Sequence, residues 1–556
     1  MKLKYIAYSA LLALAPVASS CDDFLSKLPD NRVELNTPDQ LQMLLVNGYM
    51  QYNVGVMNEI SSDNIIDNNS PDPASGMRYN LAPFERMDNE IFAWEPAESS
   101  LQQDSPSSLW QGCYHAIAVA NAVLDRIPYF ESIGQGEEVA PYKGEALLIR
   151  AYHHFLLANL FCQPYRGPEL SKQLQGIPYM TEPETTLTTV YDRGNLADVY
   201  DNIEKDLLEG LPLIDDAIYE QPKYHFNTAA ANAFAARFYL FKRDYENVVK
   251  YANLAFGGEA GPAQSALNDV WQHSFADPDQ ITQYYISVER QSNFLLLPTV
   301  STAARLVGTR YAWNREGVNA TINGQGPTWQ DFNFHPCYDG KIYIVGGEQY
   351  GLFFPGTCGE LFEYTDKIAG IGYTHIVRPE FTAEETLLCR AEAKIFLGDI
   401  DGGVADLRIW DENRQNNTHP EYDMPDLTRE LIESFYSNPP AEGMVKPLHI
   451  DEVCPSDKYS VTPANELYLQ CVLHYRRIET FHTGMRWFDI RRFGIEIEHY
   501  IGANGHDILK WDDPRRAYQL PADVLTSGME PTIRDYVSTP SNQEYVKSAV
   551  SCVKIK

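Results

Sequence analysis

The sequence predicts a mostly α-helical fold, in which tetratricopeptide-like helical hairpins form a scaffold interrupted by long irregular segments. Three observations lead to this prediction. Several segments have hydrophobic residues at the spacing of an amphipathic helix. A short pattern with an arginine among alanines recurs in three of them. The stretches between are rich in glycine, asparagine and aromatic residues and lack helical period.

The predicted helices are identified from a 3.6-residue hydrophobic period and from residues that favour helix ends. Thr37, followed by Pro38, begins the first helix, and Asn227 precedes another. Leu211-Pro212 ends a third, because proline has no backbone N–H to continue the hydrogen bonds. The predicted helices span residues 38–47, 108–126, 141–161, 196–211, 228–241, 245–256, 383–397, 402–412 and 465–480.

A weak internal repeat supports the hairpin scaffold. Arg150, Arg237 and Arg390 each lie inside an apolar, alanine-rich helix face. The second and third copies are followed by a tight turn and a further amphipathic segment, and small residues let two helix axes approach closely. This is the arrangement of tetratricopeptide-like hairpins. The copies are unevenly spaced, so the scaffold must contain insertions.

Three segments lack helical period: 53–98, 257–378 and 420–463. A loop-rich insertion as long as the second one is usually functional. We therefore divide the chain into a leader, an N-terminal helical region, a loop-rich insertion that we expect to face a ligand, and a C-terminal region. Their predicted bounds are 1–20, 21–256, 257–378 and 379–556.

The first 23 residues have the pattern of a lipoprotein export signal. Lys2 and Lys4 precede a short apolar run, and small residues lead into Cys21. The run is too short to cross about 30 Å of hydrocarbon. We expect cleavage before Cys21 and lipid on that residue, so that only acyl chains hold the mature protein to a membrane. An ordinary signal peptide that is cut nearby is the alternative.

The charge of the chain limits its partners. It has 44 lysines and arginines against 76 aspartates and glutamates, which gives a net charge of −32. Such a surface repels phosphate backbones, so nucleic acid is not expected as a partner. Docking on anionic lipid through a basic patch is excluded for the same reason.

The sequence contains no recognisable catalytic or cofactor motif: HExxH, GxSxG, a phosphate-binding loop and a dinucleotide fingerprint are all missing. His153 and His154 are adjacent, so on a helix they point about 100° apart and cannot share a metal. The segment from Asp399 to Gly402 is expected to be a turn between helices, because the downstream acid of a calcium loop is missing. No cofactor is predicted, and a structural calcium is left open at Asp63, Asp67 and Asp72.

The cysteines show no metal-binding spacing. Cys337 and Cys358 lie in the loop-rich insertion of an exported chain, where a disulfide between them is left open. Four others lie inside helical patterns and are expected to be buried like small hydrophobic residues. These are Cys113, Cys162, Cys389 and Cys471.

Aromatic residues make up 12% of the chain, with 35 tyrosines and 8 tryptophans. Carbohydrate sites place the faces of sugars against aromatic rings, while polar side chains bind the hydroxyls. Trp110, Trp410 and Trp487 lie in helical patterns and are assigned to the core. Four aromatic residues in irregular segments are predicted to contact a ligand in some combination, because helix packing does not explain them. They are Trp94, Tyr311, Trp313 and Trp329.

Taken together, five motifs resemble the SusD/RagB family of surface nutrient-binding lipoproteins from Bacteroidota. They lie at the expected mature N-terminus, in three predicted helical segments and near the C-terminus, so the resemblance covers nearly the whole chain. The motifs are Cys21-Asp22-Asp23-Phe24-Leu25 with Lys27 and Pro29, Trp110 to Tyr114 with Ala120-Asn121, Gly144-Glu145-Ala146 with Arg150-Ala151-Tyr152, Ala391-Glu392-Ala393 with Leu397-Gly398-Asp399, and Glu479 to Gly494 with Arg486, Asp489 and Arg491.

The resemblance implies a helical fold without catalysis, anchored by lipid on Cys21 at the outer surface of the outer membrane. It also implies a SusC-like TonB-dependent barrel as partner, and a cargo that is usually a glycan and in some members a peptide. Arg486, Asp489 and Arg491 are interpreted as buried ion pairs that lock the C-terminal helix, not as ligand contacts. A surface hydrolase with paired carboxylates and a structural adhesin are the alternative classes of function.

Overall fold

The computed structural model divides the chain into two compact units, residues 1–43 and 44–556. In the first unit, helix α3 (Pro38–Leu45) begins where the side chain of Gln40 accepts the N–H groups of Asn36 and Thr37, at 2.7 and 3.1 Å. The last two residues of α3 belong to the second unit. The leader and Cys21 lie outside the described residues. The structure describes residues 35–71, 76, 78–98, 102–184, 190–262, 264–267, 278–306, 308–313, 324–329, 341–344, 351–354, 359–414, 424–441 and 443–534.

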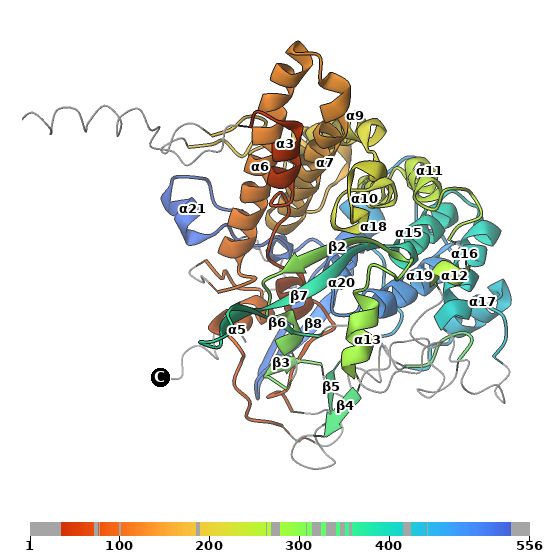
Figure 1. Ribbon diagram of the computed structural model, residues 1–556. Coiled ribbons are helices and arrows are strands. Elements are labelled where there is room, and N and C mark those ends of the chain that lie inside the picture. Colours follow the sequence, from red (N-terminus) through yellow and green to blue (C-terminus); the bar gives the residue numbers. More distant parts are fainter. Residues whose placement is uncertain are drawn as a thin grey trace, which may run out of the picture. The chain divides into compact units, whose positions relative to one another are not determined.

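The second unit begins its helical scaffold with two long helices, α6 (Pro106–Ser132) and α7 (Gly136–Phe161), which Figure 1 shows side by side. Ser105 caps α6 by accepting the N–H of Ser108 at 3.2 Å. The next helix, α9 (Leu196–Gly210), packs on α7. Both α6 and α7 are longer than the sequence predicts, because each continues through a proline near its exposed end.

Helical hairpins continue the scaffold and confirm the predicted fold class (Figure 1). The left-handed residues Arg243 (φ 59°) and Gly398 (φ 85°) lie in the turns of two successive hairpins, α10–α11 and α15–α16. Helix α19 packs on α15 and α17, and α20 follows α19 directly. The bounds are α10 (Thr228–Lys242), α11 (Tyr245–Ala255), α15 (Ala383–Phe396), α16 (Ile400–Arg414), α17 (Arg429–Ser437), α19 (Glu466–Glu479) and α20 (Met485–Phe493).

The arginines of the repeat lock neighbouring elements together. Arg150 of α7 donates from Nε and Nη2 to Asp206 of α9, at 2.6 and 2.7 Å. Arg390 of α15 makes the same two-pronged contact with Asp406 of α16, at 2.9 and 2.7 Å. Arg237 of α10 instead reaches a glutamate of the strand that precedes α15. Two copies of the repeat therefore hold their helix pairs by the same bidentate ion pair.

A three-stranded antiparallel sheet lies beside the helices, in the order β2 (Asn293–Thr299), β7 (Ile371–Thr382) and β6 (Leu361–Asp366). Its last strand, β7, runs straight into α15, and Thr382 caps that helix by accepting the N–H of Glu385 at 3.2 Å. The insertion 257–378, which the sequence predicts to be loop-rich and without a long helical period, therefore also contains strands. The signal of β2 was missed because most of its residues are buried, so its apolar run does not alternate with polar residues.

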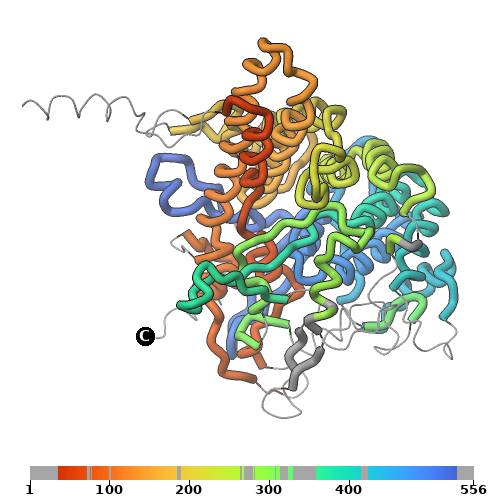
Figure 2. The backbone as a smooth tube through the Cα atoms, viewed as in Figure 1, coloured from red at the N-terminus to blue at the C-terminus, as the bar shows by residue number. Residues whose placement is uncertain are grey.

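Shorter helices and strand pairs lie between the long helices, in parts of the chain for which the sequence predicts no helix. Helix α4 is wholly buried and packs on α20, so that the blue C-terminal segments of Figure 2 meet the red N-terminal ones there. These elements are the strand pairs β1 (Ile66–Asp67) with β3 (Tyr311–Ala312), β4 (Lys341–Ile344) with β5 (Gly351–Phe354) and β8 (Ile497–Ile501) with β9 (Gly505–Leu509), and the helices α4 (Gly55–Ser61), α5 (Arg86–Phe92), α8 (Gly167–Ser171), α12 (Gln264–Leu267), α13 (Pro278–Tyr285), α18 (Ile450–Val453) and α21 (Ala522–Thr526).

The core contains the four cysteines that were expected to be buried, each at most 1% exposed, and this prediction is confirmed. Cys337 and Cys358 lie outside the described residues. Trp110, Trp410 and Trp487 are buried as predicted. Within the described ranges, no helix combines the length and apolar character that a membrane span requires.

Candidate functional site

The two irregular regions predicted to form a ligand surface do meet in the structure. Strands β1 and β3 pair, with Ile66 opposite Ala312. Next to this pair, Arg310 donates from Nε and Nη2 to Asp67, at 2.9 and 2.7 Å. Residues from the first irregular region and from the insertion therefore share one location, as the sequence predicts.

Trp94 and Tyr311 lie at this location, but inside it. They are 3% and 1% exposed. The ring of Trp94 stacks on His499 with centroids 4.2 Å apart, His499 stacks on Phe92 at 4.0 Å, and Phe92 lies 4.6 Å from Tyr311. The indole N–H of Trp94 donates to a backbone carbonyl at 3.0 Å, and the Tyr311 hydroxyl donates to an asparagine at 2.9 Å. The two residues are thus the ends of a buried column of four rings.

The other two predicted aromatic residues, Trp313 and Trp329, are each 1% exposed. Trp313 meets Phe481 edge-to-face, with ring centroids 4.3 Å apart. Trp329 is fixed because the preceding Thr328 donates to Asp411 of α16 at 2.9 Å, and its own indole N–H donates to a backbone carbonyl at 2.8 Å. A sugar would reach any of the four rings only after the protein rearranges, and their contact with a ligand stays a prediction.

Exposed aromatic side chains lie instead on the hairpin of β6 and β7. Phe362, Tyr364 and Tyr373 are 47%, 52% and 38% exposed, and Ile368 and Ile371 near the turn are more exposed still. Apolar groups clustered on a surface commonly mark a site of interaction, because folding gives no reason to place them in water. We call this exposed segment, residues 361–375, the aromatic hairpin. It belongs to the insertion that the sequence predicts to face a ligand.

The register of the hairpin places its rings on both faces. Phe362 and Tyr364 project from one face, with centroids 4.8 Å apart in an edge-to-face arrangement. Opposite Tyr364 stands Gly372, and a Cβ there would lie 2.7 Å from the ring of Phe362 and 2.0 Å from a carbonyl of β6. The missing side chain lets Phe362 lie close over the sheet. Tyr373 projects from the other face, opposite Glu363.

Polar groups surround the aromatic hairpin. At its base, Arg305 donates to Glu360 from Nε and Nη2, at 2.5 and 3.0 Å, and its guanidinium lies 5.6 Å from the ring centre of Phe84. At the tip, Asp366 accepts the N–H groups of Ile368 and the next residue, at 2.9 and 3.0 Å. Rings for sugar faces and charged groups for hydroxyls are therefore present together, which is the combination that carbohydrate recognition needs.

The sequence contains a signal for this hairpin, which the division into helices and irregular segments overlooks. Residues 362–365 and 371–374 alternate apolar side chains with polar residues or glycine, and a turn with Gly370 (φ 67°) lies between them. Alternation on both sides of a glycine-containing turn predicts a β-hairpin. The exposure of its rings was not predictable, because alternation indicates two faces without indicating which one is covered.

The signature residues Arg486, Asp489 and Arg491 near the C-terminus are buried. Arg486 donates to Asp63 at 2.8 and 2.9 Å, and Asp489 accepts from Arg476 and Arg492 at 2.9 and 2.8 Å. Burial alone would raise the pKa of Asp489, but the two arginines hold it below its usual range. These contacts agree with the interpretation of Arg486 and Asp489 as buried ion pairs.

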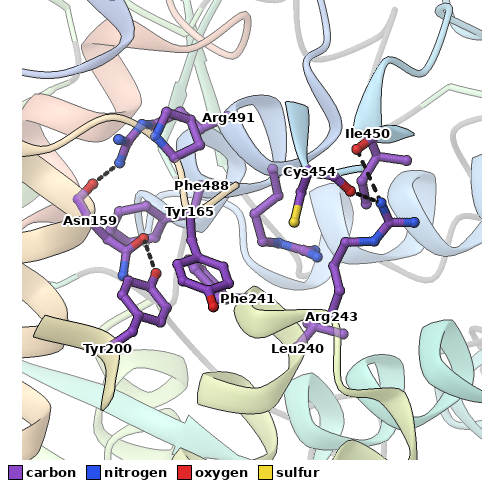
Figure 3. Close-up of a pocket in the computed structure, with 12 residues that line it drawn as sticks. Asn159, Tyr165, Tyr200, Leu240, Phe241, Arg243, Ile450, Cys454, Phe488 and Arg491 are labelled. Carbon is purple, nitrogen blue, oxygen red and sulfur yellow. Dashed lines mark hydrogen bonds between the residues drawn. The ribbon is translucent and has the colours of Figure 1, made fainter. Parts of the chain in front are cut away.

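Arg491 does not form the ion pair that this interpretation expects of it. Its guanidinium donates to the backbone carbonyls of Asn159 and Cys162 at the end of α7, and no described carboxylate pairs with it. Burial lowers the pKa of Arg491 to about 10. The arginine thus caps the negative end of a helix. It also lines the cavity shown in Figure 3, together with Tyr200 and Phe488; at about 20 Å³ this cavity has room for one water molecule and none for a nutrient.

The structure also places the residues considered for metal binding. Asp63 and Asp67 both pair with arginines, and Asp72 lies outside the described residues. Asp399 accepts the N–H of Gly402 at 3.0 Å and forms the expected turn between α15 and α16. Among the described residues, no group of three or more metal-binding side chains is present.

His153 and His154 are core residues. Their Nδ1 atoms contact the carbonyls of the preceding helical turn, at 2.7 and 2.8 Å, and their Nε2 atoms accept the N–H groups of Met50 and Met180. Burial lowers the pKa of His153 to about 4 and that of His154 to about 3. Both rings therefore stay neutral at physiological pH and tie neighbouring segments to α7.

Comparisons with known proteins identify the fold. Residues 23–240 match the family model SusD-like_3, described as "Starch-binding associating with outer membrane". A SusD superfamily protein from Bacteroides thetaiotaomicron is 15% identical with a TM-score of 0.59, over 90% of this chain and 100% of that one. A SusD superfamily protein from Bacteroides vulgatus is 16% identical with a TM-score of 0.56, over 89% and 99%.

A laminarin binding SusD-like protein is 14% identical with a TM-score of 0.50, over 89% of this chain and 98% of that one. Curated proteins gave no match to the sequence.

Proposed function

The chain is SusD-like, in the sequence of residues 23–240 and in its fold, and from this premise we propose that it captures a nutrient glycan at the cell surface without catalysis. It delivers the glycan to a SusC-like TonB-dependent transporter in the outer membrane, to which lipid on Cys21 keeps it close. The family description supports association with the outer membrane and binding of starch. A solved relative of the same fold is a laminarin binder, which supports a glycan as cargo.

The observation that carries the proposal is the aromatic hairpin. Phe362, Tyr364 and Tyr373 are exposed, and the carboxylate of Glu363 lies next to Tyr373. An apolar sugar face stacks on such a ring, while hydroxyls donate to carboxylates. We propose that one of the two faces of the hairpin receives the glycan, with Phe362 and Tyr364 as the first candidates because they form a pair.

One feature favours peptide capture as the second candidate. Strand β6 is the outer strand of its sheet among the described elements, and each of its residues from Phe362 to Asp366 is exposed. An extended peptide adds to such an edge through backbone hydrogen bonds. In this second proposal the aromatic hairpin binds a peptide in place of a glycan.

The test uses the mature chain, residues 21–556, with Cys21→Ser to keep it free of lipid. A glycan and peptide array first identifies a ligand, and calorimetry then measures its affinity for Phe362→Ala, Tyr364→Ala and Tyr373→Ala. We expect at least one variant to bind more than tenfold more weakly, since aromatic residues at the centre of a site commonly contribute roughly 2 kcal/mol or more. Tyr129→Ala is the matched control, because Tyr129 is 40% exposed but lies on α6.

Unchanged affinity in all three hairpin variants, with the fold intact by circular dichroism, overturns the placement of the site. A depletion assay addresses the absence of catalysis: a binding protein saturates at one ligand per site, whereas a hydrolase consumes the glycan with time. Co-purification of a TonB-dependent barrel with the lipidated protein from its native membrane tests the partner.

A further inference from the structure

A second concave surface lies against the outer face of α6 and shares no residue with the aromatic hairpin. It is a groove of about 470 Å³ between α6, residues 178–184 with Tyr191, and the region of α21. Pockets of this size suit a small ligand or a few units of a polymer. The side chains that matter for its chemistry are Trp110, Tyr114, Glu182, Glu184, Tyr191 and Asp523.

Hydrogen bonds hold the walls of this groove in place. The hydroxyl of Tyr114 donates to the carbonyl of Pro178 at 2.9 Å, and the amide of Asn121 donates to the carbonyls of Met180 and Glu182, at 3.0 and 3.3 Å. These contacts join α6 to the segment opposite. On the other side, the amide of Gln111 donates to the Asp523 carboxylate at 3.0 Å. A preformed groove loses little entropy on binding.

Aromatic rings form one corner of the groove. The centroids of Trp110 and Tyr114 are 4.9 Å apart and their planes meet at 53°. Tyr191 also lines the groove, and its hydroxyl donates to Glu184 at 2.9 Å. The faces of tryptophan and tyrosine rings attract a cation that lies over them.

The acidic and basic side chains that line the groove are three carboxylates and His115. Glu182, Glu184 and Asp523 line it, and no lysine or arginine does. A tyrosine hydroxyl and a glutamine amide donate to the last two, and these neutral groups leave the charges in place. Within the described part of the chain, no basic side chain forms an ion pair with any of the three. An anion that enters this space meets uncompensated repulsion.

We propose that this groove is a second binding site, for a ligand that bears an ammonium or guanidinium group. The cation lies near the corner of Trp110 and Tyr114, within the field of the three carboxylates. Two sources supply this chemistry, a glycan with free amino groups and a peptide with lysine or arginine. The groove thus recognises the positive charge of its ligand, whereas the aromatic hairpin is proposed to recognise the apolar face of a sugar ring.

Calorimetry with four short probes tests the proposal on the mature, lipid-free chain. The probes are tri-lysine, the glucosamine trimer, the neutral sugar maltotriose and tri-glutamate. We expect one or both cationic probes to bind, and to bind more weakly as salt is added, because salt screens partly exposed charges. Tri-glutamate should not bind. The difference between tri-lysine and the glucosamine trimer identifies the source.

Charge-neutralising variants then locate the binding. Asp523→Asn and the double variant Glu182→Gln, Glu184→Gln should each weaken the cationic probe by about fivefold or more, the effect of losing a partly exposed charge pair. Glu137→Gln is the matched control, because Glu137 is exposed but lies in the first turn of α7, beyond the far end of α6. Phe362→Ala should leave this binding unchanged, so failure here is distinct from failure of the proposed glycan site.

The proposal is overturned if neither cationic probe binds. It is overturned equally if maltotriose binds as tightly as the cationic probes and competes with them, or if the neutralised groove binds a cation as tightly as the wild type. These substitutions lie on the surface, so circular dichroism and the melting temperature should match those of the control.

Discussion

Asp63, in the turn after α4, accepts hydrogen bonds from Nε and Nη2 of Arg486 on α20, at 2.8 and 2.9 Å, although the two residues are 423 positions apart. Lys446 approaches the same carboxylate at 2.8 Å and Arg477 at 3.5 Å. Burial alone would raise the pKa of Asp63, but these three cations hold it well below its usual range. One carboxylate therefore joins the N-terminal segment of the second unit to its last helices.

We expect Asp63→Asn to lower the free energy of unfolding by about 3–5 kcal/mol, because it leaves the buried Arg486 and the partly buried Lys446 and Arg477 without their partner. Since the pKa is depressed in the folded state, this stabilisation is present above about pH 4 and is lost as the pH falls below that value. Urea denaturation at neutral pH measures the loss. Asp401→Asn, whose side chain is 82% exposed, is the control, and an equal loss in both variants contradicts the prediction.

Asp489→Ala tests whether the C-terminal signature is structural. Asp489 is 1% exposed and pairs with Arg476 and Arg492. Its removal should lower the melting temperature, with a loss of about 3–5 kcal/mol, while the folded fraction keeps its affinity for glycan. Calorimetric titration and thermal unfolding separate the two effects. Reduced affinity at an unchanged melting temperature would show that the signature binds the ligand.

Glu59 of α4 should make stability depend on pH. Its buried carboxylate accepts from Asn64 and from the N–H of Gly484, at 3.0 and 2.9 Å, and burial raises its pKa to about 7. The folded protein then binds more protons than the unfolded chain between about pH 4.5 and pH 7. This contribution stabilises the fold at low pH and is lost as the pH rises through 7.

Glu59→Gln cannot ionise, so we expect it to gain stability relative to the wild type on going from about pH 5 to about pH 8, by up to about 3 kcal/mol. Urea denaturation at both pH values gives the difference. Glu137→Gln controls for the loss of an exposed carboxylate. If the wild type and Glu59→Gln change by the same amount between the two values, Glu59 does not titrate in this range.

Trp94→Ala and Trp329→Ala distinguish a core role from a ligand role. Trp94 ends the buried ring column and Trp329 is buried in the segment that Thr328 fixes to α16, so each substitution should lower the free energy of unfolding by about 3–5 kcal/mol. The folded fraction should still bind the glycan as the wild type does. A loss of affinity without a loss of stability would return these rings to the ligand site, as the sequence predicts.

Cys21→Ala should abolish lipid attachment and release the protein into the soluble fraction, because acyl chains alone are proposed to hold so acidic a protein to the membrane. Radiolabelled palmitate, compared between variant and wild type in the same cells, measures the attachment. Equal labelling of the two proteins would rule out Cys21 as the lipidation site.

The sequence by itself determined the helices of the helical-hairpin scaffold, and it missed shorter helices such as α4 and α20. Hydrophobic period and capping residues are local signals, and Asn227 caps α10 as they predict, accepting the N–H of Ala230 at 3.0 Å. Local patterns also predicted the burial of the four cysteines and the turn at Asp399. They failed for β2, whose apolar run lacks a period of its own and which pairs with β7 far along the chain.

Only the tertiary structure decided which aromatic rings are covered. Trp94 and Tyr311 lie in segments without helical period, yet both are buried. His499 stacks on Trp94 and Phe92 packs on Tyr311, and each of these partners is far away in the sequence from the ring that it contacts. Phe362 also lies outside the helical patterns of the sequence, yet it is exposed, and among the described elements only β7 pairs with its strand β6. Burial depends on neighbours brought together by folding, and residue type and local spacing do not specify those neighbours.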